Sequence, residues 1–95
     1  MTTHELKCWP SYFRAIRQEQ KRFELRKHDR DFAVGDRLLL REYDPTPTEE
    51  RTGSSPYTGE QLYAWVTYVL PIDGGRVIMS IEVEWPVPSP ASKEE

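Results

Sequence analysis

The sequence predicts a small α+β protein that is mostly β: a mixed-strand β-barrel of about five strands with one helix after the first strand. Two observations predict this class. Five short segments have the alternation or the apolar composition of strands, and one segment between the first two has apolar residues at helical spacing. The 95 residues suffice for one domain with a thin core, and a closed sheet would protect its strand edges.

The first strand and the helix are expected within the first twenty residues. Residues 4–9 alternate, with Leu6 and Cys8 on one face, which predicts a short strand. Pro10 then suits the first turn of a helix that we expect to end near Gln20. The apolar stripe of this helix has three- and four-residue spacing and consists of Tyr12, Phe13 and Ile16.

The second strand is expected at residues 22–26, where the hydrophobic period returns to two. Phe23 and Leu25 are predicted to face the core, because alternate residues of a strand point to opposite sides. The opposite face then carries a polar row of Arg22, Glu24 and Arg26.

Three further strands follow. Residues 37–43 and 76–85 read as strands, and residues 61–70 are apolar on both faces, as in a central strand. Residues 44–60 are rich in Pro and Gly, and they predict either a functional flap or a mobile hairpin tip.

The domain is expected to comprise residues 1–85, and residues 86–95 have the composition of a disordered C-terminal tail. The residues predicted to face inward are Phe23, Leu25, Leu38, Leu40, Val66, Tyr68, Met79 and Ile81.

Charge is distributed unevenly along the chain. The net charge is −3, but residues 1–30 carry eight basic against four acidic side chains, whereas residues 31–95 carry five against twelve. Proteins that coat long nucleic acids neutralise many phosphates and are usually basic overall, so the sequence argues against that class. A localised anionic ligand remains compatible with the basic segment.

Other features of the sequence predict where the protein is located and whether it uses a cofactor. A single cysteine cannot close an internal disulfide, and Cys8 is expected to be a buried small hydrophobe. No metal-ligand spacing is present, so we expect neither a metal nor another cofactor. The N-terminus shows no charged and apolar leader and no apolar run is long enough for a membrane span; we expect a cytoplasmic monomer without membrane association.

The most informative local feature is the spacing of Lys21, Glu24 and Arg26. Two cations flanking a carboxylate can hold an anion while the carboxylate reads a donor edge, such as that of a nucleobase. The alternative is an ordinary surface ion pair on a strand, which contributes little stability.

This segment resembles the signature of the ASCH superfamily, within the PUA-like β-barrels, whose motif has the form G-x-K-x-x-E-x-R. Lys21, Glu24 and Arg26 match its last three fixed positions, and Glu19 stands where the glycine would be. Other segments are similar to a subgroup of small phage and bacterial proteins: His4-Glu5-Leu6-Lys7, Asp29-Arg30-Asp31-Phe32, Val34-Gly35-Asp36, Leu40-Arg41-Glu42-Tyr43-Asp44, Tyr57-Thr58-Gly59 and Val66-Thr67-Tyr68-Val69-Leu70.

The resemblance implies a PUA-like barrel whose motif lines a cleft beside the helix and binds RNA or a nucleotide. Some ASCH members hydrolyse an acylated cytidine with the motif lysine and a threonine three positions later, but here that position is Glu24. A carboxylate is no hydroxyl awaiting activation, so this mechanism is not transferred.

Our leading hypothesis is therefore a binding module for RNA or a nucleotide. The expected ligand-binding residues are Lys21, Glu24, Arg26, Lys7, Arg30, Arg41 and Tyr43. The aromatic residues that can stack a base are Trp9, Tyr12, Phe32, Tyr43 and Tyr57. Two alternatives stay open: a hydrolase of a modified nucleoside that uses Lys21 and Glu24 as an acid–base pair, and an accessory protein that binds a host protein through its acidic face.

Overall fold

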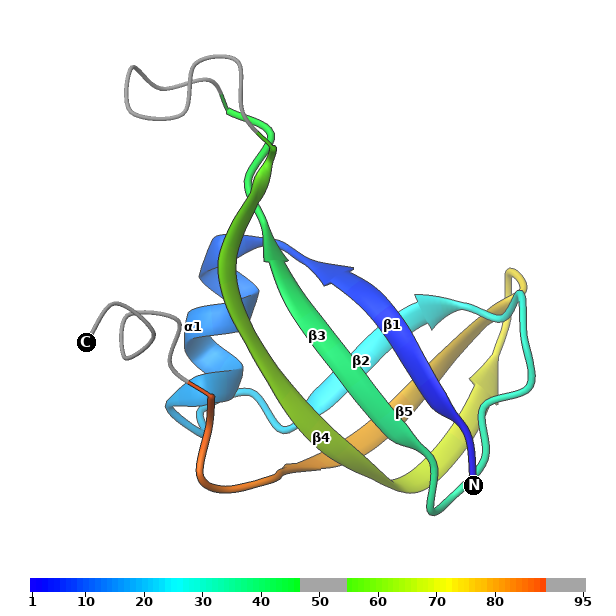
Figure 1. The fold of residues 1–95 in the computed structure, drawn as a ribbon. Helices are drawn as coiled ribbons and strands as arrows, with labels where there is room; N and C mark the ends of the chain where they lie inside the picture. Colours follow the sequence, from blue (N-terminus) through cyan, green and yellow to red (C-terminus); the bar gives the residue numbers. More distant parts are fainter. Residues whose placement is uncertain (47–54, 89–95) are drawn as a thin grey trace.

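A computed structural model describes residues 1–46 and 55–88 of the chain. It contains five strands and one helix (Figure 1). Their bounds are β1 Thr3–Cys8, α1 Pro10–Arg17, β2 Phe23–Lys27, β3 Arg37–Tyr43, β4 Tyr57–Ile72 and β5 Arg76–Val83. The predicted class, mostly β with one helix after the first strand, is confirmed.

The five strands form one mixed sheet in the order β1-β3-β4-β5-β2. β1 pairs in parallel with β3, and the other neighbours are antiparallel. Figure 1 shows that the sheet curls into a half-barrel, with α1 at one side. β1 and β2 are its two edges, and α1 connects them along the chain. Within the described ranges, no helix is long and apolar enough to cross a membrane.

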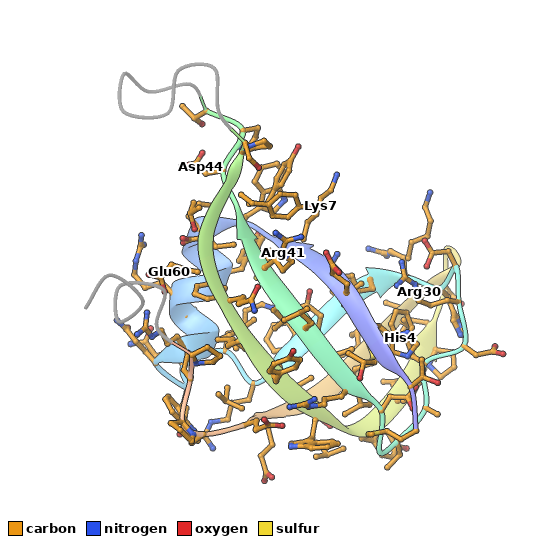
Figure 2. All side chains as sticks on the ribbon, in the orientation of Figure 1. His4, Lys7, Arg30, Arg41, Asp44 and Glu60 are labelled. Atoms are coloured by element: carbon orange, nitrogen blue, oxygen red, sulfur yellow. The ribbon has the colours of Figure 1, made fainter. Side chains whose placement is uncertain are left out.

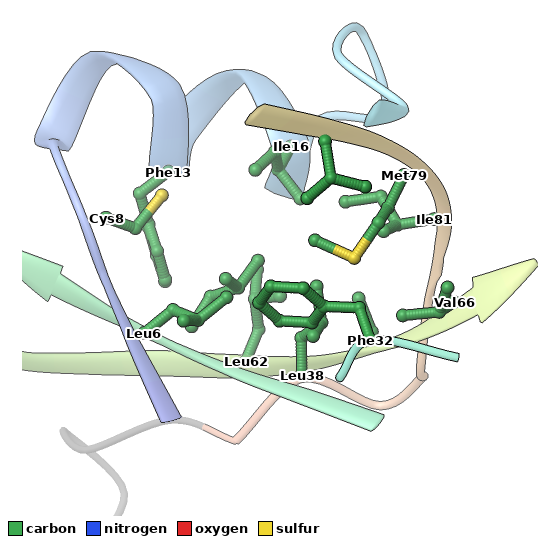
Figure 3. Close-up of a cluster of buried hydrophobic side chains, with 13 residues drawn as sticks. Leu6, Cys8, Phe13, Ile16, Phe32, Leu38, Leu62, Val66, Met79 and Ile81 are labelled. Carbon is green, nitrogen blue, oxygen red and sulfur yellow. The ribbon is translucent and has the colours of Figure 1, made fainter. Parts of the chain in front are cut away.

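The hydrophobic core fills the inside of the curl (Figure 3). The helix contributes Phe13 and Ile16, which face the sheet at the spacing expected of an apolar stripe. The sheet and its connections contribute Leu6, Cys8, Phe32, Leu38, Leu40, Leu62, Ala64, Val66, Val77, Met79 and Ile81. The inward prediction is thus confirmed for Leu38, Leu40, Val66, Met79 and Ile81.

The inward prediction is wrong for β2. Phe23 and Leu25 are 47% and 44% exposed, whereas Glu24 between them is only 4% exposed. Strand alternation is present, but its faces are inverted relative to the hydrophobic pattern. The reason is that the Glu24 carboxylate is paired with two cations, which makes its burial tolerable, while β2 is an edge strand that borders a pocket to which Phe23 and Leu25 are exposed.

The prediction is also wrong for Tyr68, which is exposed. The pairing of β4 with β5 shifts register between Val66 and Tyr68, so Thr67 is an extra residue on β4. A bulge of this kind reverses the faces of all later residues. Val69 therefore packs against the core and Leu70 is exposed.

β4 begins at Tyr57, four residues earlier than expected, because Tyr43 and Tyr57 still pair across the hairpin of β3 and β4. The centre of the expected flap or hairpin tip, residues 47–54, lies outside the described residues. At the other end, Val87 packs against the core, and residues 89–95 of the expected tail also lie outside the described part of the chain.

A buried polar pair fixes the start of β1 against the turn before β3. His4 Nε2 and Asp36 Oδ2 are 2.8 Å apart, and Asp36 also accepts hydrogen bonds from the backbone N–H groups of Thr2 and Ala33. Burial acts to raise the pKa of Asp36, but these hydrogen bonds outweigh it and hold the pKa below its ordinary value. The two residues are 32 positions apart, and the sequence pattern gave no sign of the pairing.

The helix ends at Arg17, and the chain leaves it through Glu19, which has a φ of 61°. This left-handed conformation is the one that glycine adopts readily at helix ends. Two side-chain contacts hold Glu19 there: Trp85 Nε1 donates to its carboxylate at 2.9 Å, and Arg22 Nε donates to its carbonyl at 3.0 Å. Position 19 therefore has a backbone conformation that is typical of glycine.

The core assignment makes a stability prediction for Leu40, which is fully buried. Leu40→Ala should lower the free energy of unfolding by about 2 to 5 kcal/mol, because it removes buried methyl groups and leaves a cavity. Leu70→Ala is the control on an exposed leucine and should cost less than about 1 kcal/mol. Urea titration measures both, and equal losses would overturn the assigned faces.

The backbone at Glu19 makes a second prediction. Glu19→Ala and Glu19→Gly both remove the hydrogen bond from Trp85, but only glycine also relieves the positive φ. The glycine variant should therefore be the more stable of the two by about 0.5 to 1 kcal/mol, after allowing for the greater freedom of glycine in the unfolded chain. Thermal or urea unfolding of the pair tests this, and an alanine variant as stable as the glycine variant would contradict it.

Candidate ligand pocket

The candidate site is a pocket in the seam between the edge strands β1 and β2, beside the start of α1. Its volume is about 360 Å³, within the range of small-ligand sites. We call it the seam pocket. Its lining residues are Lys7, Cys8, Trp9, Tyr12, Lys21, Phe23, Glu24, Leu25 and Arg26.

Glu24 anchors the charged part of the seam pocket. Its Oε1 is 3.2 Å from Lys21 Nζ and its Oε2 is 2.6 Å from Arg26 Nε. The carboxylate side chain is 6% exposed, whereas those of the two cations are 17% and 24% exposed. The predicted convergence of Lys21, Glu24 and Arg26 therefore occurs, with the carboxylate buried beneath more accessible cations rather than beside them on the surface.

Arg26 also bridges the seam itself. While its Nε is held by Glu24, its Nη2 donates to the backbone carbonyl of Lys7 on the opposite edge. β1 and β2 are not sheet neighbours, so this side chain replaces the ladder of backbone hydrogen bonds that a closed barrel would have. Arg26 therefore stabilises the contact between the two edge strands and also lines the pocket.

Aromatic rings form the apolar walls of the seam pocket. Trp9, Tyr12 and Phe23 each leave about half of their surface exposed, which is high for such large apolar groups. Lys21 Nζ lies 5.4 Å from the ring centre of Tyr12 and 4.6 Å from that of Phe23. Trp9 and Tyr12 were expected as stacking residues, but Phe23 was missed, because its apolar character assigned it to the core.

Cys8 contributes a neutral wall. Burial is the largest effect that raises the pKa of its thiol to about 12, and the negative charge of Glu24 adds to it. The thiol therefore stays protonated at neutral pH and is no nucleophile. This confirms the expectation that Cys8 is a buried small hydrophobe.

The charge of the seam pocket is positive. The charged residues in its lining are three basic side chains and one carboxylate, namely Lys7, Lys21, Arg26 and Glu24. A second cavity of about 360 Å³ lies on the other side of Lys21, but there Lys21 and Arg22 are balanced by Glu19 and Glu82. Of these two cavities, the seam pocket is the better suited to an anion.

The other predicted site residues divide into two groups. Arg41 and Tyr43 lie beside the seam pocket, since Lys7 Nζ is 4.6 Å from the Tyr43 ring centre and Arg41 pairs with Lys7 in the β1–β3 register. Arg30 is not brought to the pocket. It contacts Asp29 and Phe32, and Figure 2 shows it well separated from Lys7 and Arg41.

Phe32 was expected as a possible stacking residue, but it is a core residue whose ring lies 4.7 Å from that of His4. Among residues 1–46 and 55–88, no three His, Cys, Asp or Glu side chains converge in a way that could hold a metal ion.

Residues 3–81 match the model of a protein family described as "Domain of unknown function (DUF3850)". The match covers β1 to most of β5, and the chain belongs to this family. A comparison with curated proteins finds no match.

The geometry of Glu24 makes a stability prediction. Glu24→Gln keeps the shape but leaves Lys21 and Arg26 without their buried counter-charge, so it should lower the free energy of unfolding by about 1.5 to 3 kcal/mol. Glu82→Gln, an exposed change on β5, should stay within about 0.5 kcal/mol. Chemical denaturation compares the two, and a loss at Glu24 as small as that at Glu82 would show that the cluster does not hold the seam.

Proposed function

We propose that this DUF3850 domain binds RNA or a free nucleotide, with one nucleotide held in the seam pocket. The observation that carries the proposal is the combination, in one cavity of about 360 Å³, of three cations, a single buried carboxylate and three half-exposed aromatic rings. A nucleotide has the two matching parts, a planar base and an anionic phosphate. The proposal includes a PUA-like, ASCH-type assignment, which is supported by the glycine-like φ of 61° at Glu19 in the motif.

The aromatic walls support recognition of the base. Single-stranded nucleic acids are commonly bound by stacking their bases on Tyr, Trp or Phe, at about 1 to 3 kcal/mol per base. Lys21 lies near the rings of Tyr12 and Phe23, and it thereby combines a cation with the stacking surface. Exposed aromatic rings on a thin-cored protein are otherwise a solubility liability.

The cations support binding of the phosphate. Glu24 neutralises one of the two positive charges nearest to it and fixes the positions of both Lys21 and Arg26. Because both carboxylate oxygens already accept hydrogen bonds from these cations, we assign Glu24 a positioning role in place of direct reading of a donor edge. Lys7 is exposed and forms no ion pair with a carboxylate among the residues that the structure describes, so it is the cation best able to meet a phosphate.

The test measures binding of the four ribonucleoside 5′-monophosphates and their nucleosides to the wild type, Tyr12→Ala and Lys7→Ala. Tyr12→Ala should weaken the binding of both nucleotides and nucleosides by about 1 to 3 kcal/mol, because it removes a stacking surface for the base. Lys7→Ala should weaken nucleotide binding by about 0.5 to 1 kcal/mol and leave nucleoside binding unchanged, because only the phosphate contacts the lysine charge. The backbone carbonyl that Arg26 uses is retained in this variant.

Two controls match the removed groups. Tyr68→Ala removes an exposed aromatic ring from β4, and Lys27→Ala removes an exposed lysine from β2; neither residue lines the seam pocket. Both should bind like the wild type. If nucleotides bind to none of these proteins, or if the pocket variants and the controls behave alike, the proposal is wrong.

The hydrolase alternative is tested in parallel with an N-acylated cytidine. Lys21 Nζ and Glu24 Oε1 are close enough, at 3.2 Å, to exchange a proton, but Arg26 holds the second oxygen of Glu24. Both carboxylate oxygens are thus engaged by cations and the side chain is only 6% exposed, so a substrate water has poor access to it. We therefore expect no turnover, and turnover that Glu24→Gln abolishes would favour the enzyme.

A further inference from the structure

A strip of alternating aromatic and cationic side chains continues from the seam pocket across the outer face of the sheet. Its members are Trp9, Lys7, Tyr43, Arg41 and Tyr57, and we call it the aromatic strip. The ring centres of Trp9 and Tyr43 are 5.8 Å apart, and those of Tyr43 and Tyr57 are 5.1 Å apart. Lys7 Nζ lies 4.6 Å from the Tyr43 ring centre, and the Arg41 guanidinium carbon lies 4.0 Å from that of Tyr57.

Strand pairing explains why these residues are neighbours. Lys7 is the register partner of Arg41, and Tyr43 is the partner of Tyr57. The residues that alternate with them, Cys8 and Leu40, are buried in the core, so the strip lies on the opposite, outer face. Figure 2 shows Lys7 and Arg41 at the end of the sheet where β3 and β4 approach their hairpin.

The strip joins the seam pocket without interruption. Lys7 and Trp9 line the pocket and also contact Tyr43, so each belongs to both surfaces. A ligand that leaves the pocket past either residue meets the Tyr43 ring next.

The charges of the strip suit an anion of modest length. Glu5 accepts a hydrogen bond from Arg41 Nη1 at 2.7 Å, and the Glu42 carboxylate accepts one from Thr58. Lys7 has no carboxylate partner among the described side chains. The Arg41 guanidinium has five N–H donors, so it can bind a phosphate while one of them is held by Glu5. The strip therefore has two cations, Lys7 and Arg41, and one acid paired with them, Glu5. Two cations are far fewer than a protein needs to neutralise the phosphates along a long duplex.

The ring geometry indicates which nucleic acid fits. Both ring pairs meet nearly edge to face, at 73°, so they offer no flat platform for a continuous stack of bases. Separate rings at different tilts suit bases that are splayed apart, as in single-stranded RNA, and not the closed stack of a duplex.

We infer that the domain binds single-stranded RNA over about three nucleotides, with one in the seam pocket and the next two on the aromatic strip. The inference rests on the proposed function, because the strip extends the pocket. It adds that a short single strand, and not a free mononucleotide, is the preferred ligand.

The test compares a mononucleotide with a trinucleotide of the same base. The trinucleotide should bind at least about tenfold more tightly, since one additional stacked base already contributes on that order. With a 5′-phosphate like that of the mononucleotide, the trinucleotide has three phosphates, and contact with all three should give a log–log salt slope of about −2.1. Tyr57→Ala and Arg41→Ala should each remove most of the gain of the trinucleotide and should weaken mononucleotide binding far less than trinucleotide binding.

A matched control exists on the same face of the same two strands. Arg37 and Tyr63 form a similar cation–ring pair at 3.8 Å, but at the other end of β3 and away from the seam pocket. Tyr63→Ala should therefore keep the full gain of the trinucleotide. Tyr57→Phe, which keeps the ring, should keep it as well.

A measurement on the wild type makes the test independent of variant folding. The ring resonances of Tyr57, which contacts no residue that lines the seam pocket, should shift with the trinucleotide and stay in place with the mononucleotide. Equal affinities of the two ligands, or equal effects of Tyr57→Ala and Tyr63→Ala, would overturn the inference while mononucleotide binding still supports the seam pocket. Failure of both ligands to bind would overturn the pocket and the strip together.

Discussion

The buried carboxylate of Glu24 is the interaction on which the seam of this half-barrel depends. An edge strand would ordinarily turn its apolar residues inward, yet β2 turns Glu24 inward and leaves Phe23 and Leu25 half exposed. A carboxylate out of water is costly unless it is paired, and here Lys21 and Arg26 pair it on both oxygens. Removing the carboxylate would leave both cations uncompensated, so these three residues act as one unit.

That unit links stability to the pocket. The sheet does not close by backbone pairing between β1 and β2, and Arg26 spans the gap by donating to the Lys7 carbonyl. The open seam leaves a cavity. Lys21, Glu24 and Arg26, which hold the two edge strands together, also line this cavity. Lys7 and Trp9 then connect the cavity to the rings of Tyr43 and Tyr57 on the outer face of the sheet.

The turn at Glu19 shows how a residue that lacks the freedom of glycine can occupy a glycine-like position. Its backbone has a positive φ, which is unfavourable for a side chain with a Cβ. Trp85, at the far end of the chain, donates a hydrogen bond to the Glu19 carboxylate, and Arg22 donates to its carbonyl. These contacts offset a local preference, and the one from Trp85 also ties the segment after β5 to the turn that follows α1.

The sequence by itself determined the elements and much of the charge cluster. Hydrophobic period located the five strands and the helix, and the spacing of Lys21, Glu24 and Arg26 predicted that they converge. Tertiary structure decided which face of β2 is buried, the bulge that turns Tyr68 outward, and the separation of Arg30 from the pocket. Period specifies that alternate residues share a face, but only partners from distant segments, such as the cations around Glu24, determine whether that face can be buried.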